Sequence, residues 1–159
     1  MTAAEDIFGR NEDMIFVSHY DSPLGMIYMA ADDDVLKGVW FEGQKYFASG
    51  LDKKETEDKE TPVLKQTKEW LDLYFAGKEP EFLPPLAPEG SEFQKKVWKI
   101  LLMIPYGKTM TYGEIGRKVA KMSGKKTMSA QAVGGAVGHN PISILIPCHR
   151  VVGTNGSLT

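Results

Sequence analysis

The stretch from residue 140 to residue 152 reads NPISILIPCHRVV and contains Cys148, the only cysteine of the 159-residue chain. Its apolar run, residues 144–146, is too short for a typical helix and is bounded by Pro141 and Pro147, so it predicts a buried extended segment. Proline also restricts the backbone immediately before the cysteine. The pattern therefore predicts a rigidly held thiol.

Two interpretations of Cys148 remain open on this stretch alone. A free cysteine after an apolar run is usually a small buried core residue. A rigid backbone that carries a thiol beside His149 and Arg150 is also how a chain would hold a nucleophile. One such nucleophile would belong to a thiol hydrolase with a Cys–His pair, which needs an oxyanion hole and turns over esters or peptides.

Composition limits the class of protein. A length of 159 residues with 42% hydrophobic residues predicts a folded chain of one ordinary domain or two small ones. No apolar run approaches about 18 residues and no N-terminal leader is present, which predicts a cytoplasmic protein without membrane association. One cysteine excludes an intramolecular disulfide, and with three scattered histidines it predicts no closed zinc site.

The net charge of −2 conceals an asymmetry between the two halves. Residues 1–90 contain nine Lys/Arg against 19 Asp/Glu, whereas residues 91–159 contain ten against two. A basic half that carries the cysteine predicts a polyanionic partner. The alternative is that these charges only form solvated faces.

The first half predicts a small α/β domain. Runs rich in β-branched and aromatic residues alternate with turn-forming residues and predict a three-stranded antiparallel sheet: 14–20, 25–31 and 35–41. The charged residues 50–60 predict a loop or an exposed helix end. Thr61 is a candidate N-cap, and Pro62 fits the first position of an amphipathic helix that ends near Gly77.

The proline-rich residues 78–90 predict an extended linker between two domains. We therefore expect an N-terminal domain over residues 1–87, the end of the linker at 88–90, and a second domain over 91–159.

Three capping signals divide the second half into helices. Ser91 with Gln94 and Thr111 with Glu114 form capping-box patterns, and Ser129 is a candidate N-cap for a third helix rich in alanine and glycine. The last two helices are either a helical hairpin or a helix-turn-helix that binds DNA, and the pattern alone does not separate them. Basic charge favours the second alternative.

Several motifs resemble the O6-alkylguanine-DNA alkyltransferase family. They are AQAVGGAVGHNP at 130–141, IPCHRV at 146–151, and, more weakly, TYGEI at 111–115 and YDSPLG at 20–25. The resemblance implies an α+β fold. Its parts are a ribonuclease-H-like α/β domain with the three-stranded antiparallel sheet and a helical domain with a winged-helix-like helix-turn-helix.

The resemblance also implies a function. Members of this family repair DNA by stoichiometric, irreversible transfer of an alkyl group, such as methyl, from O6-alkylguanine or O4-alkylthymine to the matching cysteine, here Cys148. They act without a metal or cofactor, as monomers, on double-stranded DNA that they approach from the minor groove with the target base flipped out. The alternative within DNA binding is a lesion sensor without transfer activity.

The resemblance assigns catalytic roles to four residues. Cys148 is the nucleophile, His149 activates it through a water, Tyr112 assists base rotation and protonates the leaving guanine, and Asn140 fixes the turn beneath the cysteine. Each residue also has an ordinary explanation: Tyr112 as a packed side chain, Asn140 as a helix stop before proline, and His149 as a polar core residue. Because adjacent residues of an extended segment point to opposite sides, we expect His149 not to touch the sulfur directly.

The DNA-binding residues follow from the same resemblance. Gln131 stands where family members often have an arginine that braces the gap left by the flipped base, and glutamine predicts weaker stabilisation. Gly134 and Gly135 disfavour a helix, which predicts close approach of the backbone to DNA. Other expected contacts come from Ser129 and Ala130, and the carbonyls of Cys148 and Val151 are expected to recognise the guanine.

The chain stops at Thr159, whereas family members continue into a Tyr-x-Gly-Gly loop and a terminal helix. These parts help to form the base pocket and to orient the histidine. We therefore expect this chain to transfer alkyl groups poorly compared with a full-length parent.

Overall fold

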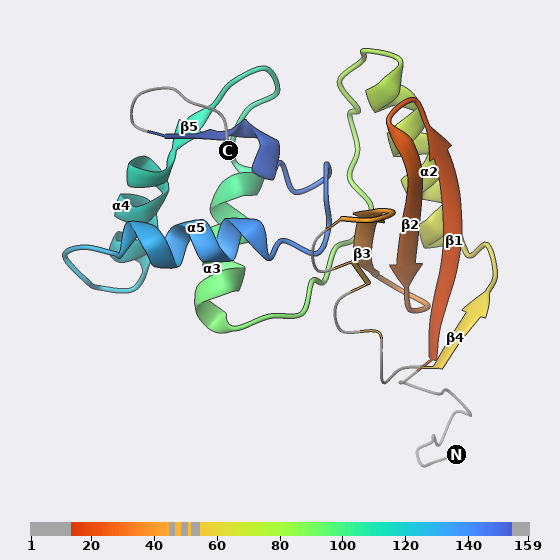
Figure 1. Cartoon of the computed structure of the whole chain (residues 1–159), viewed down its shortest axis with the longest axis horizontal. Helices are drawn as coiled ribbons and strands as arrows, with labels where there is room; N and C mark the ends of the chain where they lie inside the picture. The colour runs from red at the N-terminus through yellow and green to blue at the C-terminus, as the bar shows by residue number, and fades with distance from the viewer. Residues whose placement is uncertain (1–13, 45–46, 49–50, 52–54, 154–159) are drawn as a thin grey trace. The chain divides into compact units, whose positions relative to one another are not determined.

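The computed structural model describes residues 14–44, 47–48, 51 and 55–153 (Figure 1). They form two compact units that meet in sequence between Ala87 and Pro88. This division falls within the proline-rich stretch, and the independence of the two units as domains stays a prediction. Among the described residues, no helix has the length and apolar character needed to cross a bilayer.

The first unit contains a four-stranded sheet in the order β3-β2-β1-β4 (Figure 1). Its strands are β1 (Met14–Ser22), β2 (Gly25–Ala31), β3 (Leu36–Phe41) and β4 (Glu55–Asp58). The first three form the predicted antiparallel meander. The prediction of a loop or helix end was wrong for β4, which pairs in parallel with β1. All four of its residues are exposed, so no apolar alternation marked it as a strand.

Both faces of this sheet are covered. Helix α2 (Pro62–Phe75) lies against one face (Figure 1), where Phe75 stacks on Tyr20 of β1. On the opposite face, Trp40 belongs to a buried cluster, and Phe47 lies 6.3 Å from it between ring centroids. A sheet buried on both sides supplies the apolar area that a unit of this size needs.

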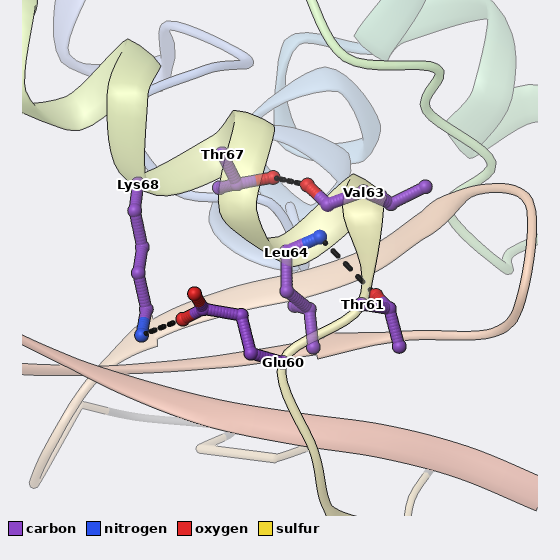
Figure 2. Close-up of polar contacts among 6 residues, drawn as sticks. All are labelled: Glu60, Thr61, Val63, Leu64, Thr67 and Lys68. Carbon is purple, nitrogen blue, oxygen red and sulfur yellow. Dashed lines mark hydrogen bonds and ion pairs between the residues drawn. The ribbon is translucent and has the colours of Figure 1, made fainter.

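Local hydrogen bonds define the start of α2 as the sequence predicted (Figure 2). The Thr61 hydroxyl accepts a hydrogen bond from the Leu64 amide at 3.3 Å, and proline occupies the first helical position. One turn later, the Thr67 hydroxyl donates to the Val63 carbonyl. Lys68, within the helix, forms an ion pair at 2.6 Å with Glu60, the residue that precedes the N-cap.

The second unit contains three mutually packed helices and a pair of short strands. They are α3 (Glu92–Leu102), β5 (Met110–Thr111), α4 (Tyr112–Met122), α5 (Ala130–Gly138), the 3₁₀ turn η1 (Cys148–Arg150) and β6 (Val151–Val152). The capping boxes at Ser91 and Thr111 and the N-cap at Ser129 are confirmed. Helices α4 and α5 with the turn between them form the predicted helix-turn-helix, and β5 pairs in parallel with β6.

Candidate active site

The segment that leads to Cys148 is buried but not extended. Residues 141–147 are all buried, as the apolar run predicted. The prediction of an extended conformation was wrong, because the chain folds back through tight turns, with the Ile146 amide donating to the Ile142 carbonyl at 3.0 Å. A short apolar run between two prolines is compatible with a folded-back loop as well as with an extended segment. The sequence pattern therefore could not distinguish these two conformations.

Asn140 closes this loop from within. Its side-chain amide donates to the Ile146 carbonyl at 2.8 Å, and its side-chain oxygen accepts from the Ile142 amide at 2.9 Å. The Ile146 carbonyl also accepts from the Cys148 amide at 2.8 Å. One carbonyl oxygen therefore connects the asparagine clamp directly to the backbone of the cysteine.

Two very tight turns lie inside the loop. The Leu145 amide donates to the Ser143 carbonyl across Ile144, whose φ is +71°. Such a γ-turn with a positive central φ is rare, and it is strained for a β-branched residue. Pro147 lies at φ −80° and ψ 69°, which is the favourable inverse γ-turn. The strained turn at Ile144 and the relaxed turn at Pro147 together direct the backbone so that Cys148 reaches the surface of the unit, where it is partly exposed.

Cys148, His149 and Arg150 form the 3₁₀ turn η1. The premise that Cys148 and His149 point to opposite sides of an extended segment was therefore wrong, since consecutive residues of a 3₁₀ helix are rotated by only about 120°. Arg150 fastens this turn to the segment that follows α3: its guanidinium donates to the Ile104 carbonyl at 2.9 Å and lies 5.6 Å from the centroid of the Tyr106 ring.

The charge state of the thiol follows from its surroundings. Burial raises the pKa of Cys148, and hydrogen bonds from the Asn140 side chain and from the backbone partly oppose that rise. Partial burial and the positive charge of Arg150 lower the pKa of His149, so its imidazole is neutral at pH 7 and able to accept a proton.

Pairing of β5 with β6 brings the start of α4 next to the cysteine turn. Thr111 pairs with Val152 and Met110 with Val151, so Tyr112, the first residue of α4, follows directly on this pair. A Cβ atom on Gly134 of α5 would lie 3.8 Å from Cε1 of the Tyr112 ring. The structure thus brings Tyr112, Gly134 and Val151 into one region with the cysteine loop.

Other predicted residues lie elsewhere on α5. Ser129, Ala130 and Gln131 are exposed at its N-terminal end, and Gly135 is exposed midway along it. Asn140 follows the opposite end, about 13 Å away for a helix of this length. The predicted residues therefore form two groups, one around Cys148 and an exposed one at the start of α5.

Sequence reasoning missed three contributors to this site. Ile144 provides the strained turn, Tyr106 contacts the arginine after the cysteine, and the indole of Trp98 donates to the Ala136 carbonyl of α5 at 2.8 Å. The last two contacts join residues more than 35 positions apart. No local periodicity or capping pattern contains such information.

This arrangement holds the Cys148 thiol in a clamped turn, next in sequence to a neutral imidazole, in the unit that also carries the helix-turn-helix. A model of the ribonuclease-like domain of 6-O-methylguanine DNA methyltransferase matches residues 15–88, and a model of the DNA-binding domain of the same enzyme matches residues 92–159. The chain belongs to this methyltransferase family. The resemblance on the sequence motifs is thus confirmed over nearly the whole chain.

The names of similar proteins agree with the family assignment. The chain is 41% identical over 146 residues to the methylated-DNA–protein-cysteine methyltransferase of Methanosarcina acetivorans, a match that covers 91% of this chain and 88% of the relative. The corresponding protein of Haemophilus influenzae is 36% identical and is covered to 77%. Both relatives carry the name of a methyltransferase that acts on methylated DNA.

Solved structures of the family share the fold. The O6-methylguanine methyltransferase of Mycobacterium tuberculosis matches with a TM-score of 0.75 at 40% identity, over 92% of this chain and 83% of that chain. A structure of the M. tuberculosis protein OGT in complex with DNA matches with a TM-score of 0.74 at 36% identity, over 92% of this chain and 82% of that chain. The predicted α+β architecture is therefore that of the family.

Proposed function

We propose that this protein repairs DNA by transferring an alkyl group from the O6 oxygen of guanine, and from O4 of thymine, to the sulfur of Cys148. The observation that carries the proposal is the partly exposed thiol at the end of a buried, clamped turn. It lies in the unit matched by the DNA-binding domain of the methyltransferase family. The names of the relatives support the same reaction.

The reaction needs only a thiolate, a proton acceptor and a proton donor. The Cys148 thiolate attacks the alkyl carbon, a C–S bond forms, and the C–O6 bond breaks with its electron pair moving to the guanine. The proton lost by the thiol passes through water to His149, and the leaving guanine takes up one proton from Tyr112. The thioether is stable, so each protein molecule reacts once.

Asn140 and two backbone carbonyls complete the proposed catalytic group. Asn140 holds the turn and contributes a hydrogen bond that favours the thiolate. The carbonyls of Cys148 and Val151 recognise the guanine edge. This assignment gives each residue of the group around Cys148 a contact with the reacting base or with the nucleophile.

The exposed group forms the proposed DNA interface. We assign Ser129, Ala130 and Gln131 at the start of α5, together with Gly134 and Gly135 along it, to minor-groove contact with double-stranded DNA. The target base must leave the stack, at a cost of a few kcal/mol. Gln131 would brace the resulting gap by hydrogen bonding to the orphaned base. The excess of basic residues in 91–159 supports binding to phosphates.

The same proposal includes the setting in which the protein acts. The protein would work in the cytoplasm and as a monomer. It would need no metal or organic cofactor, because thiolate attack on an alkyl carbon requires none.

Intact-protein mass spectrometry after incubation with a duplex containing O6-methylguanine tests the proposal. We expect the unmodified protein to gain one methyl group and no more, and Cys148→Ser to gain none. Peptide mapping should place the methyl group on Cys148. An unmodified duplex serves as the second control.

Two other outcomes would replace the proposal. Tight binding of the damaged duplex with no gain of mass would point to a lesion sensor. Many turnovers on esters or peptides that depend on Cys148 would point to a thiol hydrolase, because a thioether product cannot turn over.

A further inference from the structure

Trp98 forms an unusual contact with the helix that precedes the cysteine loop. Its indole N–H donates to the Ala136 carbonyl at 2.8 Å, and the side chain is only 2% exposed. The ring is also tightly enclosed, since a Cβ atom on Gly90 would lie 2.5 Å from it. A buried hydrogen bond from a fully packed ring is held in one geometry.

This hydrogen bond engages the carbonyl that a continued α5 would use. In a continued α-helix, the Ala136 carbonyl would accept the amide of residue 140, four positions later. The Asn140 amide instead donates to the Val137 carbonyl at 3.3 Å. Residue 141 is proline and has no amide proton to offer Val137. The Asn140 amide therefore has two possible acceptors, and the indole of Trp98 satisfies one of them.

The choice of acceptor determines where Asn140 lies. If the Trp98 donor is removed, the buried Ala136 carbonyl lacks that partner, and the Asn140 amide is the nearest replacement. Taking it would wind α5 further and draw the asparagine away from the carbonyl of Ile146. That carbonyl also accepts the Cys148 amide, so the displacement would reach the nucleophile.

We propose that Trp98 is a positioning residue for the transfer reaction: its indole N–H ends α5 before Asn140 and thereby holds Cys148 in its reactive position. The inference rests on the proposed function for its catalytic consequence. Its structural part, from Trp98 through Asn140 to the cysteine, concerns contacts that exist with or without DNA.

The test compares Trp98→Phe with Trp40→Phe. Phenylalanine keeps an aromatic ring and removes the N–H, and Trp40 is an equally buried tryptophan of the first unit, 1% exposed. Single-turnover assays with an excess of O6-methylguanine duplex give the rate constant of transfer separately from the fraction of active protein. We expect Trp98→Phe to lower the rate constant roughly tenfold or more, with duplex affinity unchanged within about twofold. Trp40→Phe should leave the rate constant unchanged.

A second readout does not depend on DNA repair. Iodoacetamide alkylates the Cys148 thiolate and releases iodide, so its rate against pH reports the ionisation of the thiol. Displacement of Asn140 removes a hydrogen bond that favours the thiolate, and the midpoint of the profile should move to higher pH in Trp98→Phe. His149 and Arg150, the titratable residues that follow the thiol in η1, are the same in every variant.

The two readouts separate the failure of this inference from failure of the proposed function. If the unmodified protein transfers no alkyl group, the repair function fails, and the iodoacetamide midpoint alone decides the role of Trp98. A rate constant within about twofold of the unmodified protein, or an unshifted midpoint where no transfer occurs, would overturn the inference. If Trp98→Phe does not fold, site-specific incorporation of 3-benzothienylalanine at position 98 removes the N–H while it keeps the ring shape, and the same outcomes apply.

Discussion

Two turns of this protein are closed by the same device, a side chain that donates one hydrogen bond to the backbone and accepts another. In the β1–β2 hairpin, the Ser22 hydroxyl donates to the Gly25 carbonyl at 2.6 Å and accepts from the Leu24 amide at 3.1 Å. The Ser22 side chain is itself only 8% exposed, but the residues that follow it face water, and Leu24 is 74% exposed. Glycine takes the positive φ of +120°, so the turn has little backbone strain.

The turn closed by Asn140 differs because the residues that follow its side chain are buried as well. It is buried throughout, and Ile144, a β-branched residue, takes the positive φ. A conformation of this kind costs about 1–3 kcal/mol and persists only where the surrounding structure enforces it. The exposed turn ends in an ordinary strand, whereas the buried turn ends at Cys148. Backbone strain is thus present in the turn that leads to the Cys148 thiol and absent from the turn that only reverses the chain direction.

The largest expected effect comes from Asn140→Ala. The substitution leaves the Ile146 carbonyl and the Ile142 amide buried without the asparagine, which should lower the free energy of unfolding by about 2–4 kcal/mol. The nucleophile would also lose its position, so the transfer rate constant should fall roughly 100-fold. Urea denaturation and single-turnover assays measure the two effects. A stable variant with an unchanged rate constant would show that the clamp has no role in catalysis.

Much of the fold was predictable because its signals are local. The caps at Ser91 and Thr111 satisfy backbone amides within three residues, so a short sequence pattern contains the whole interaction. In the three strands of the meander, apolar residues alternate with polar ones or stand in short clusters, and turn-forming residues separate the strands. Strand β4 has only charged residues and threonine, and its partner β1 lies about 40 positions earlier. Neither its composition nor its distance in sequence from β1 therefore predicted that it is a strand.

The sequence motifs nominated candidate residues for the site, whereas the geometry of the site was not predictable from them. The resemblance of the motifs marked Cys148 and Asn140, while the positive φ of Ile144 contradicts the conformational preference of isoleucine and follows no sequence rule. Contacts such as that of Arg150 with the Ile104 carbonyl span 46 positions. Tertiary packing determines these features, and only a three-dimensional structure reveals them.

The strain at Ile144 can be measured against a neighbouring isoleucine. Ile142→Gly and Ile144→Gly remove the same side chain from two buried positions of the same loop, 0% and 8% exposed. Glycine also relieves the positive φ at position 144 alone. We therefore expect Ile144→Gly to destabilise the protein by about 1–3 kcal/mol less than Ile142→Gly. Equal losses in urea denaturation would mean that the turn stores no strain.

The pH dependence of the transfer rate constant tests how burial affects the reactivity of the Cys148 thiol. Burial raises the pKa of Cys148, so the thiolate is the minor form at neutral pH and its fraction grows as pH rises. Below that pKa, the rate constant should increase about tenfold per pH unit. The pKa of His149 is lowered, so the imidazole is already neutral from about pH 7 upward and adds no further slope there. A flat profile of single-turnover rates between about pH 7 and pH 8.5 would exclude thiolate attack as the limiting step.

The smallest expected effect comes from Ser22→Ala, the counterpart of Asn140→Ala in the exposed turn. The Leu24 amide and the Gly25 carbonyl belong to exposed residues, so water can replace the lost hydroxyl and the loss of stability should stay below about 1 kcal/mol. Transfer to Cys148 should be unchanged in rate constant and in stoichiometry. If Ser22→Ala instead destabilised the protein as much as Asn140→Ala, burial would not be what distinguishes the two turns. The strain at Ile144 would then need an explanation other than the enclosure of the loop.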